Sequence, residues 1–129
     1  AKGINVAEAQ KRIAELTKQQ QEQNELAKQY YKQAVSIDPN NFDANFNLGV
    51  TFFNEGANIL QEINQMDMAQ YNKLGKEVEG RACGRFKQSQ SYFRKAKSIR
   101  DDDSVLNETL ENVNTQLKKF EESKVVCVE

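Results

Sequence analysis

Histidine is absent from this chain, so the side chain that most often acts as a general base or metal ligand plays no part here. A glycine-rich phosphate loop is missing too. Gly75, Gly80 and Gly84 lie inside a helical pattern, without the preceding strand that such a loop requires. We interpret these glycines as positions of close helix packing or local bending. The sequence therefore predicts no catalytic residue, no cofactor and no enzyme.

Long apolar runs and an excess of one charge are also lacking. No stretch of about 18 apolar residues is present, so we expect no membrane insertion. Eighteen basic and nineteen acidic residues give a net charge of −1, which predicts no basic surface for nucleic acid. Hydrophobic residues make up 38% of the chain, so we expect a thin core carried on narrow apolar stripes. Because the chain begins without methionine, we interpret it as a processed product or an excised fragment.

Cysteine is scarce. Cys83 and Cys127 are too few for a disulfide framework and too far apart for metal-ligand spacing. A single bridge between them is an alternative, but we expect the two to be unpaired. Arg81 and Arg85 stand two positions from Cys83 and would point elsewhere on a helix, so Cys83 is expected to be a buried structural residue and not a reactive thiol.

Proline occurs once, as Pro39, and the helical patterns between turn residues are long. Apolar residues at helical spacing predict helices at 4–37, 42–65, 68–100 and 104–122. The polar stretch 17–25 leaves open whether the first of these is one helix or two, and we favour one. The tail 123–129 is expected to be loose or to dock over the last helix.

The last predicted helix has a clear inward face and a clear start. The apolar side chains expected to point inward are Val105, Leu106, Leu110, Val113, Leu117 and Phe120. Asp101, Asp102 and Asp103 precede it, and we interpret them as capping residues that favour the positive end of the helix dipole. A metal site at these aspartates is the alternative that we do not favour.

The most informative stretch runs from Leu26 to Gly56, LAKQYYKQAVSIDPNNFDANFNLGVTFFNEG. Small and aromatic residues recur at helical spacing on both sides of Pro39, which indicates two closely packed helices. Proline disfavours helical geometry in the residue before it, so the first helix should end by Asp38. Asn41 or Asp43 is expected to cap the second.

This stretch resembles the tetratricopeptide repeat (TPR), whose motif passes from the second helix of one repeat through Asp-Pro-Asn-Asn into the next repeat. Residues 42–103 then form one repeat unit. This unit is elongated, since the usual repeat has only about 34 residues. The resemblance implies a single all-α domain over 1–129. It would consist of antiparallel helical hairpins, about four helices in a right-handed superhelix segment, some of them unusually long.

The resemblance also implies where a partner binds. The groove positions carried over from the family are Asp43, Asn47, Val50 and Asn54. Asn47 matches the asparagine that, in chaperone-binding relatives, bonds a peptide's terminal carboxylate. Val105 and Thr109 stand where the basic partners of that clamp would lie, so recognition of a chaperone's C-terminal carboxylate is not expected. The alternative is that Asn47 and Asn54 are merely solvated.

The implied function is a non-catalytic scaffold or adaptor that binds a protein or peptide partner. One alternative is a structural homo-oligomer without a foreign ligand. Another, which rests on resemblance alone, is an envelope-associated accessory protein of bacteria. The sequence leaves the compartment open between cytoplasm and bacterial periplasm or cell envelope, and it does not identify the partner.

Overall fold

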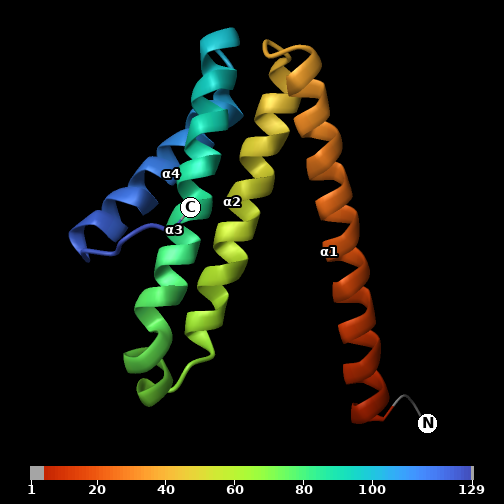
Figure 1. The fold of residues 1–129 in the computed structure, drawn as a ribbon, viewed down its shortest axis with the longest axis vertical. Coiled ribbons are helices and arrows are strands. Elements are labelled where there is room, and N and C mark those ends of the chain that lie inside the picture. Colours follow the sequence, from red (N-terminus) through yellow and green to blue (C-terminus); the bar gives the residue numbers. More distant parts are fainter. Residues whose placement is uncertain (1–4, 129) are drawn as a thin grey trace.

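The protein is a run of four helices, seen in a computed structural model that describes residues 5–128 (Figure 1). The helices are α1 (Val6–Ile37), α2 (Phe42–Asn64), α3 (Met68–Ile99) and α4 (Ser104–Glu122). No strand occurs among the described residues, so the prediction of an all-α fold is confirmed. Residue 4, where the first helix was expected to begin, and residue 129, at the end of the expected tail, lie outside the described part.

Each helix begins at a polar side chain that accepts a hydrogen bond from a backbone N–H of the first turn. These capping residues are Asn5, Asn41, Asp67 and Asp103. At α3 the cap is reciprocal, because the Gln70 side chain also accepts a 3.0 Å bond from the Asp67 backbone N–H. Local sequence thus sets the helix starts by satisfying N–H groups that would otherwise lack partners.

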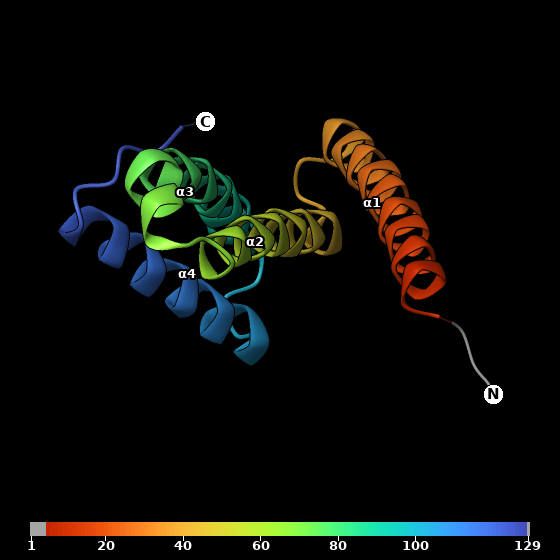
Figure 2. The same cartoon turned by 90° about the horizontal axis from the view of Figure 1, so that it is seen from below.

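α2 and α3 lie side by side as the closest pair, which Figures 1 and 2 both show. Two glycines of α2 permit this approach. A Cβ on Gly49 would lie 2.5 Å from ring carbons of Phe93, and a Cβ on Gly56 would lie 3.0 Å from the ring of Phe86. The buried Ser89 hydroxyl also donates a 2.9 Å bond to the Gly49 carbonyl. α2 and α3 are therefore held together by aromatic rings of α3 that pack directly on the glycine backbone of α2.

α4 lies across this pair and completes the core (Figure 2). One cluster consists of Phe42, Phe93, Ala96, Leu106, Leu110 and Val113. A second consists of Ala82, Cys83, Phe86 and Phe120. Val105 was predicted to point inward and does not, since it is 59% exposed. Neighbouring residues of a helix point about 100° apart. Since Leu106 points into the core, Val105 points away from it.

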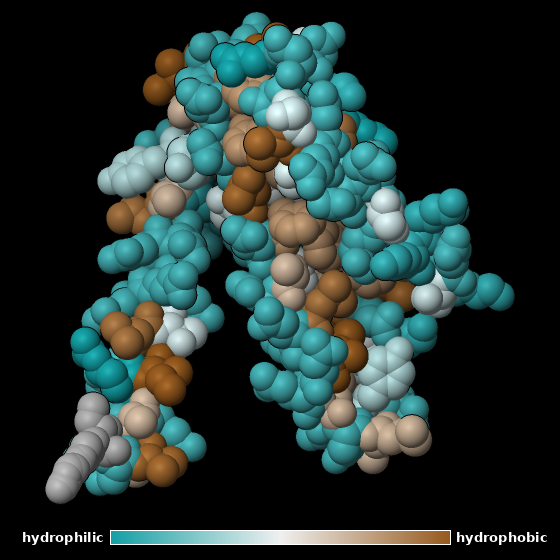
Figure 3. All heavy atoms as spheres, turned by 180° about the vertical axis from the view of Figure 1, so that it is seen from behind, coloured by the Kyte–Doolittle hydropathy of each residue, from teal (hydrophilic) through white to brown (hydrophobic). Residues whose placement is uncertain are grey.

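α1 stands apart from the other helices over much of its length (Figures 1 and 2). It is one continuous helix of 32 residues, and within Val6–Ile37 none is buried. Its second half contacts α2, whereas its first half diverges and carries exposed Val6, Ile13 and Leu16. Figure 3 shows apolar side chains along this free half.

The segment after α4 corrects two predictions. Cys83 and Cys127 form a disulfide, so the expectation that they are unpaired is wrong. Residues 125–128 run back along α3, where the Val128 N–H donates a 2.9 Å bond to the Gly80 carbonyl. The segment is therefore not loose. It packs beside Phe120 of the last helix, as the second alternative expected, and also continues onto α3. A separation of 44 residues hid this pairing, because only the fold brings the two cysteines together.

Candidate functional site

The turn between α1 and α2 fixes the angle at which the two helices meet. The Asp38 side chain accepts a 3.0 Å bond from the Asn40 N–H, and the Asp38 carbonyl accepts a 3.1 Å bond from the Asn41 N–H. Pro39 sets its own φ and moves Asp38 out of helical geometry. Asn41 then caps α2 through a 3.0 Å bond from the Ala44 N–H. The sequence left Asn41 and Asp43 as alternative caps, and Asn41 is the one used.

Asn45 locks this turn from inside. It is 1% exposed, and its Nδ2 donates to the carbonyls of Pro39 at 3.1 Å and Asn41 at 2.8 Å. A buried amide without such partners would cost the fold stability, so these bonds explain why a polar residue is tolerated here. Sequence reasoning missed Asn45, because nothing in a helical pattern distinguishes a turn-binding asparagine from a solvated one.

Below the turn, α1 and α2 diverge and leave a groove of about 210 Å³ between them. The residues that line it are Asn24, Ala27 and Tyr31 from α1, and Asn47, Val50, Thr51, Asn54, Glu55 and Asn58 from α2. Four of these nine side chains are asparagine amides, contributed by both helices.

Of the four predicted binding residues, three line the groove and one does not. Asn47, Val50 and Asn54 lie along one face of α2 and line the groove together. Asp43 lies one turn earlier, exposed and outside the lining. Its backbone carbonyl accepts a 2.8 Å bond from Asn47 Nδ2, which holds the Asn47 side chain in place. Asp43 thus contributes to the groove only by positioning the Asn47 side chain through its backbone carbonyl.

These side chains suit an extended peptide chemically. Each asparagine amide offers both a donor and an acceptor, as does each peptide unit of a bound backbone. Half-buried Tyr31 and Val50 add apolar contact area between the amides. The groove thus offers hydrogen-bond donors and acceptors beside a small apolar surface.

The charges beside the groove neutralise one another. Glu55 forms ion pairs of 2.9 Å with Lys28 of α1 and with Arg85 of α3. Lys28 is only 12% exposed and lies 5.0 Å above the Phe52 ring. Because both cations are paired with Glu55, neither is positioned to bind the carboxylate of a partner. Among residues 5–128, moreover, no group of three or more candidate ligands could hold a metal ion.

The α1 wall was missed in the sequence. Asn24 belongs to the polar stretch that we interpreted as the exposed middle of a helix, yet Asn24, Ala27 and Tyr31 share one helical face. That spacing was the available signal. The sequence predicted that small and aromatic residues of this face pack against α2. It did not predict that Asn24 lines a groove with them, because a polar residue on a helix surface is usually just solvated.

A comparison with protein families matches residues 19–56 to a TPR repeat. This confirms the resemblance over the junction, from the middle of α1 to Gly56 of α2, which is less than a third of the chain. No curated protein and no solved structure matches the chain. TPR repeats generally serve as scaffolds for protein–protein interaction and generally lack catalytic activity. Over residues 5–128, no helix combines the length and the apolar character needed to cross a membrane.

Proposed function

We propose that this chain, which carries a TPR repeat at its first helix junction, is a non-catalytic adaptor segment that binds an extended stretch of a partner protein. One observation carries the proposal: the TPR junction opens into a groove in which amide side chains from both helices face the same space. The partner stretch should be largely uncharged, because the nearby cations Lys28 and Arg85 are already paired with Glu55.

The expected contributions follow from the lining. The Asn47 and Asn54 amides bond the partner's backbone, and Val50 and Tyr31 contact its side chains. A hydrogen bond of this kind contributes about 0.5–1.5 kcal/mol, so loss of both asparagines should weaken binding by about 5- to 150-fold.

The test is affinity capture from native lysate with two matched baits. One bait carries Asn47→Ala and Asn54→Ala, and the other carries Gln29→Ala and Asn72→Ala, two exposed amides outside the groove. A partner retained by the natural chain and by the second bait, but lost by the first, supports the proposal. Equal retention by both variants would contradict the role of the groove.

Self-assembly is a second candidate function, favoured by the free half of α1. Ile13 is 62% exposed and Leu16 46%, on the same helical face that packs on α2 further along. Sedimentation equilibrium tests this candidate. A mass that rises with concentration, and returns to that of a monomer in an Ile13→Ser, Leu16→Ser variant, would support it. A monomer at all concentrations would exclude it.

A further inference from the structure

Residues 124–128, here named the strap, leave α4 through a defined turn. Lys124 has a positive φ of 59°, and its N–H donates a 3.0 Å bond to the Glu121 carbonyl. The Val125 N–H donates a 2.9 Å bond to the Phe120 carbonyl, and Val125 packs on the cluster that contains Phe120. This is a Schellman motif with its apolar contact, and it points the strap back toward α3.

α3 has a seat for the strap at Gly80. A Cβ at this position would lie 2.6 Å from the Val126 carbonyl oxygen, so a larger residue would displace the strap. The Gly80 carbonyl in turn accepts the 2.9 Å bond from the Val128 N–H. Lys76 donates a 3.2 Å bond to the Ser123 carbonyl, just before the strap begins.

The non-covalent hold on the strap is nevertheless weak. Val126 is 81% exposed and Val128 is 53% exposed, so neither buries much apolar surface. One backbone hydrogen bond to α3 and the partly buried Val125 and Cys127 must offset the entropy of ordering five residues. The Cys83–Cys127 disulfide supplies the remaining constraint, because it keeps the strap beside α3.

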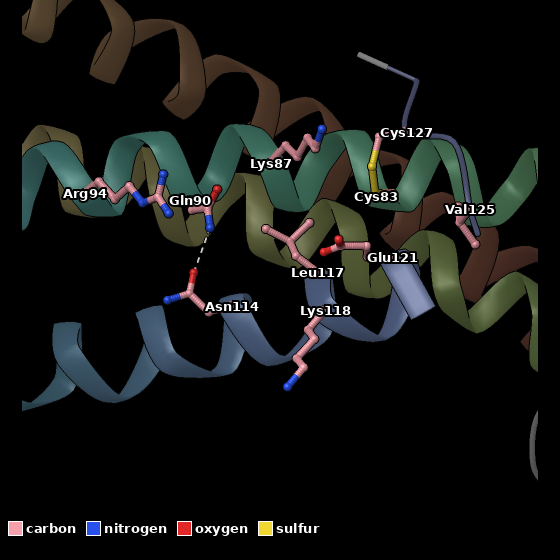
Figure 4. Close-up of a pocket in the computed structure, with 10 residues that line it drawn as sticks. All are labelled: Cys83, Lys87, Gln90, Arg94, Asn114, Leu117, Lys118, Glu121, Val125 and Cys127. Atoms are coloured by element: carbon pink, nitrogen blue, oxygen red, sulfur yellow. Dashed lines mark hydrogen bonds between the residues drawn. A yellow bond between two sulfur atoms is a disulfide. The ribbon is translucent and has the colours of Figure 1, made fainter. Parts of the chain in front are cut away.

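The strap closes one end of a second cleft, between α3 and α4, with a volume of about 460 Å³ (Figure 4). Val125 and Cys127 form that end wall, and Leu117 of α4 lines the cleft beside them. Further along, Gln90 and Asn114 bridge the two helices through a 2.7 Å hydrogen bond. Beneath the strap lies the apolar cluster of Ala82, Cys83, Phe86 and Phe120. Removal of the strap would extend the cleft onto this apolar cluster.

We infer that the Cys83–Cys127 disulfide is a redox latch, whose reduction by a dithiol frees the strap and opens the apolar end of the α3–α4 cleft. Cys83 is 1% exposed whereas Cys127 is partly exposed, so a reductant thiolate attacks the Cys127 sulfur. The sulfur–sulfur bond breaks, and Cys83 leaves as a thiolate that takes up a proton. The reductant is then joined to Cys127 in a mixed disulfide, and its second thiolate attacks its own first sulfur. Cys127 leaves as a thiolate that takes up a proton, and the reductant becomes its own disulfide.

Amide hydrogen exchange in the full chain tests the latch, with dithiothreitol as the reductant. On reduction we expect protection of the Val128 amide to fall at least tenfold, while the amides of 82–86 change less than twofold. A Cys127→Ser variant should behave like the reduced protein. The latch is refuted if Val128 stays protected after reduction, or if α3 and α4 lose protection together, because the disulfide would then be a structural staple.

A pair of glycine variants tests the seat independently. Gly80→Ala should make dithiothreitol reduce the disulfide several-fold faster, because the new methyl group displaces the Val126 carbonyl. Gly75→Ala is the matched control, since the nearest atoms to its Cβ belong to the ring of Tyr71 and not to the strap. Equal reduction rates in the two variants would contradict the proposed seating of the strap.

Discussion

Lys124 shows at the scale of one residue how the path of the chain is set. Its left-handed conformation ends α4 and turns the strap back toward α3. A residue with a Cβ adopts this conformation at a cost, and glycine is the usual choice at this position of a Schellman motif. The sequence keeps lysine instead, so the turn is formed against a local preference.

We expect Lys124→Gly to raise the free energy of unfolding by about 0.5–1 kcal/mol, because the relief of left-handed strain exceeds the extra chain entropy of glycine. Urea unfolding of the oxidised protein measures this. Lys119→Gly, one turn earlier in α4, is the control and should lose about 1 kcal/mol. A Lys124→Gly variant no more stable than the natural chain would contradict the account of this turn.

A second residue-scale prediction concerns Tyr71 and Glu79 of α3. The Tyr71 hydroxyl donates a 2.6 Å hydrogen bond to Glu79 Oε1. This bond, and then the negative charge of Glu79, raise the pKa of Tyr71 above its ordinary value of 10.0. Since the pKa in the folded state is raised, the bond's stabilisation is fully present below the unfolded-state pKa. It is lost as pH rises through the folded-state value.

Glu79→Gln should therefore lower the pKa of Tyr71, because the charge that opposes phenol ionisation is gone. Titration of the Tyr71 ring-carbon signal by NMR measures the shift directly. If Tyr71 titrates at the same pH in both proteins, the charge of Glu79 does not control its ionisation.

Individual side chains were the hardest feature to predict. The caps Asn41 and Asp103 were recognisable because capping depends on neighbours a few residues away. Asn45 and Ser89 were not, since each is buried by contacts that the fold creates: Asn45 with its turn, and Ser89 with Gly49 across 40 residues. The α1 wall of the groove was missed for the same reason.

At the scale of helices, the α2–α3 pair depends on the absence of side chains at the crossing. Phe93 packs directly on Gly49, and Phe86 packs on Gly56. Helical spacing predicted the inward face of α4, apart from Val105. It did not predict that the disulfide would tie α3 to a segment beyond α4, because that contact depends on the three-dimensional path of the chain.

Gly49→Ala should destabilise the protein by about 1–3 kcal/mol, because its methyl group would overlap the buried Phe93 ring, which has no free space to move into. Gly75→Ala again serves as the control. It should cost less stability than Gly49→Ala, because the Tyr71 ring that its methyl group would meet is partly exposed and can move, with the loss of its hydrogen bond to Glu79. Urea unfolding of both variants gives the comparison, and equal effects would contradict the role assigned to the Gly49 contact.

At the scale of the whole molecule, the chain has a packed body of α2, α3 and α4 and a long α1 that joins it at one end (Figure 1). The all-α architecture followed from the sequence, because long apolar patterns at helical spacing, interrupted by only one proline, leave few alternatives. The divergence of α1 did not. Val6 and Ile13 lie on the same helical face as Tyr31, yet only the second half of α1 meets α2.

This divergence opens the groove to which the adaptor function is assigned. Self-assembly would also use α1, but through the apolar side chains of its free half. The two accounts therefore predict different contacts: another protein in the groove in the first, and a second copy of this chain along the free half of α1 in the second.

The most direct test is site-specific photo-crosslinking in the native cell. A photoreactive amino acid replaces Asn54, inside the groove, or Asn72, an exposed asparagine on α3 that serves as the matched control. The adaptor account predicts that position 54 crosslinks to a different protein and that position 72 does not. Crosslinks from position 54 only to this same chain, or equal crosslinking from both positions, would contradict it.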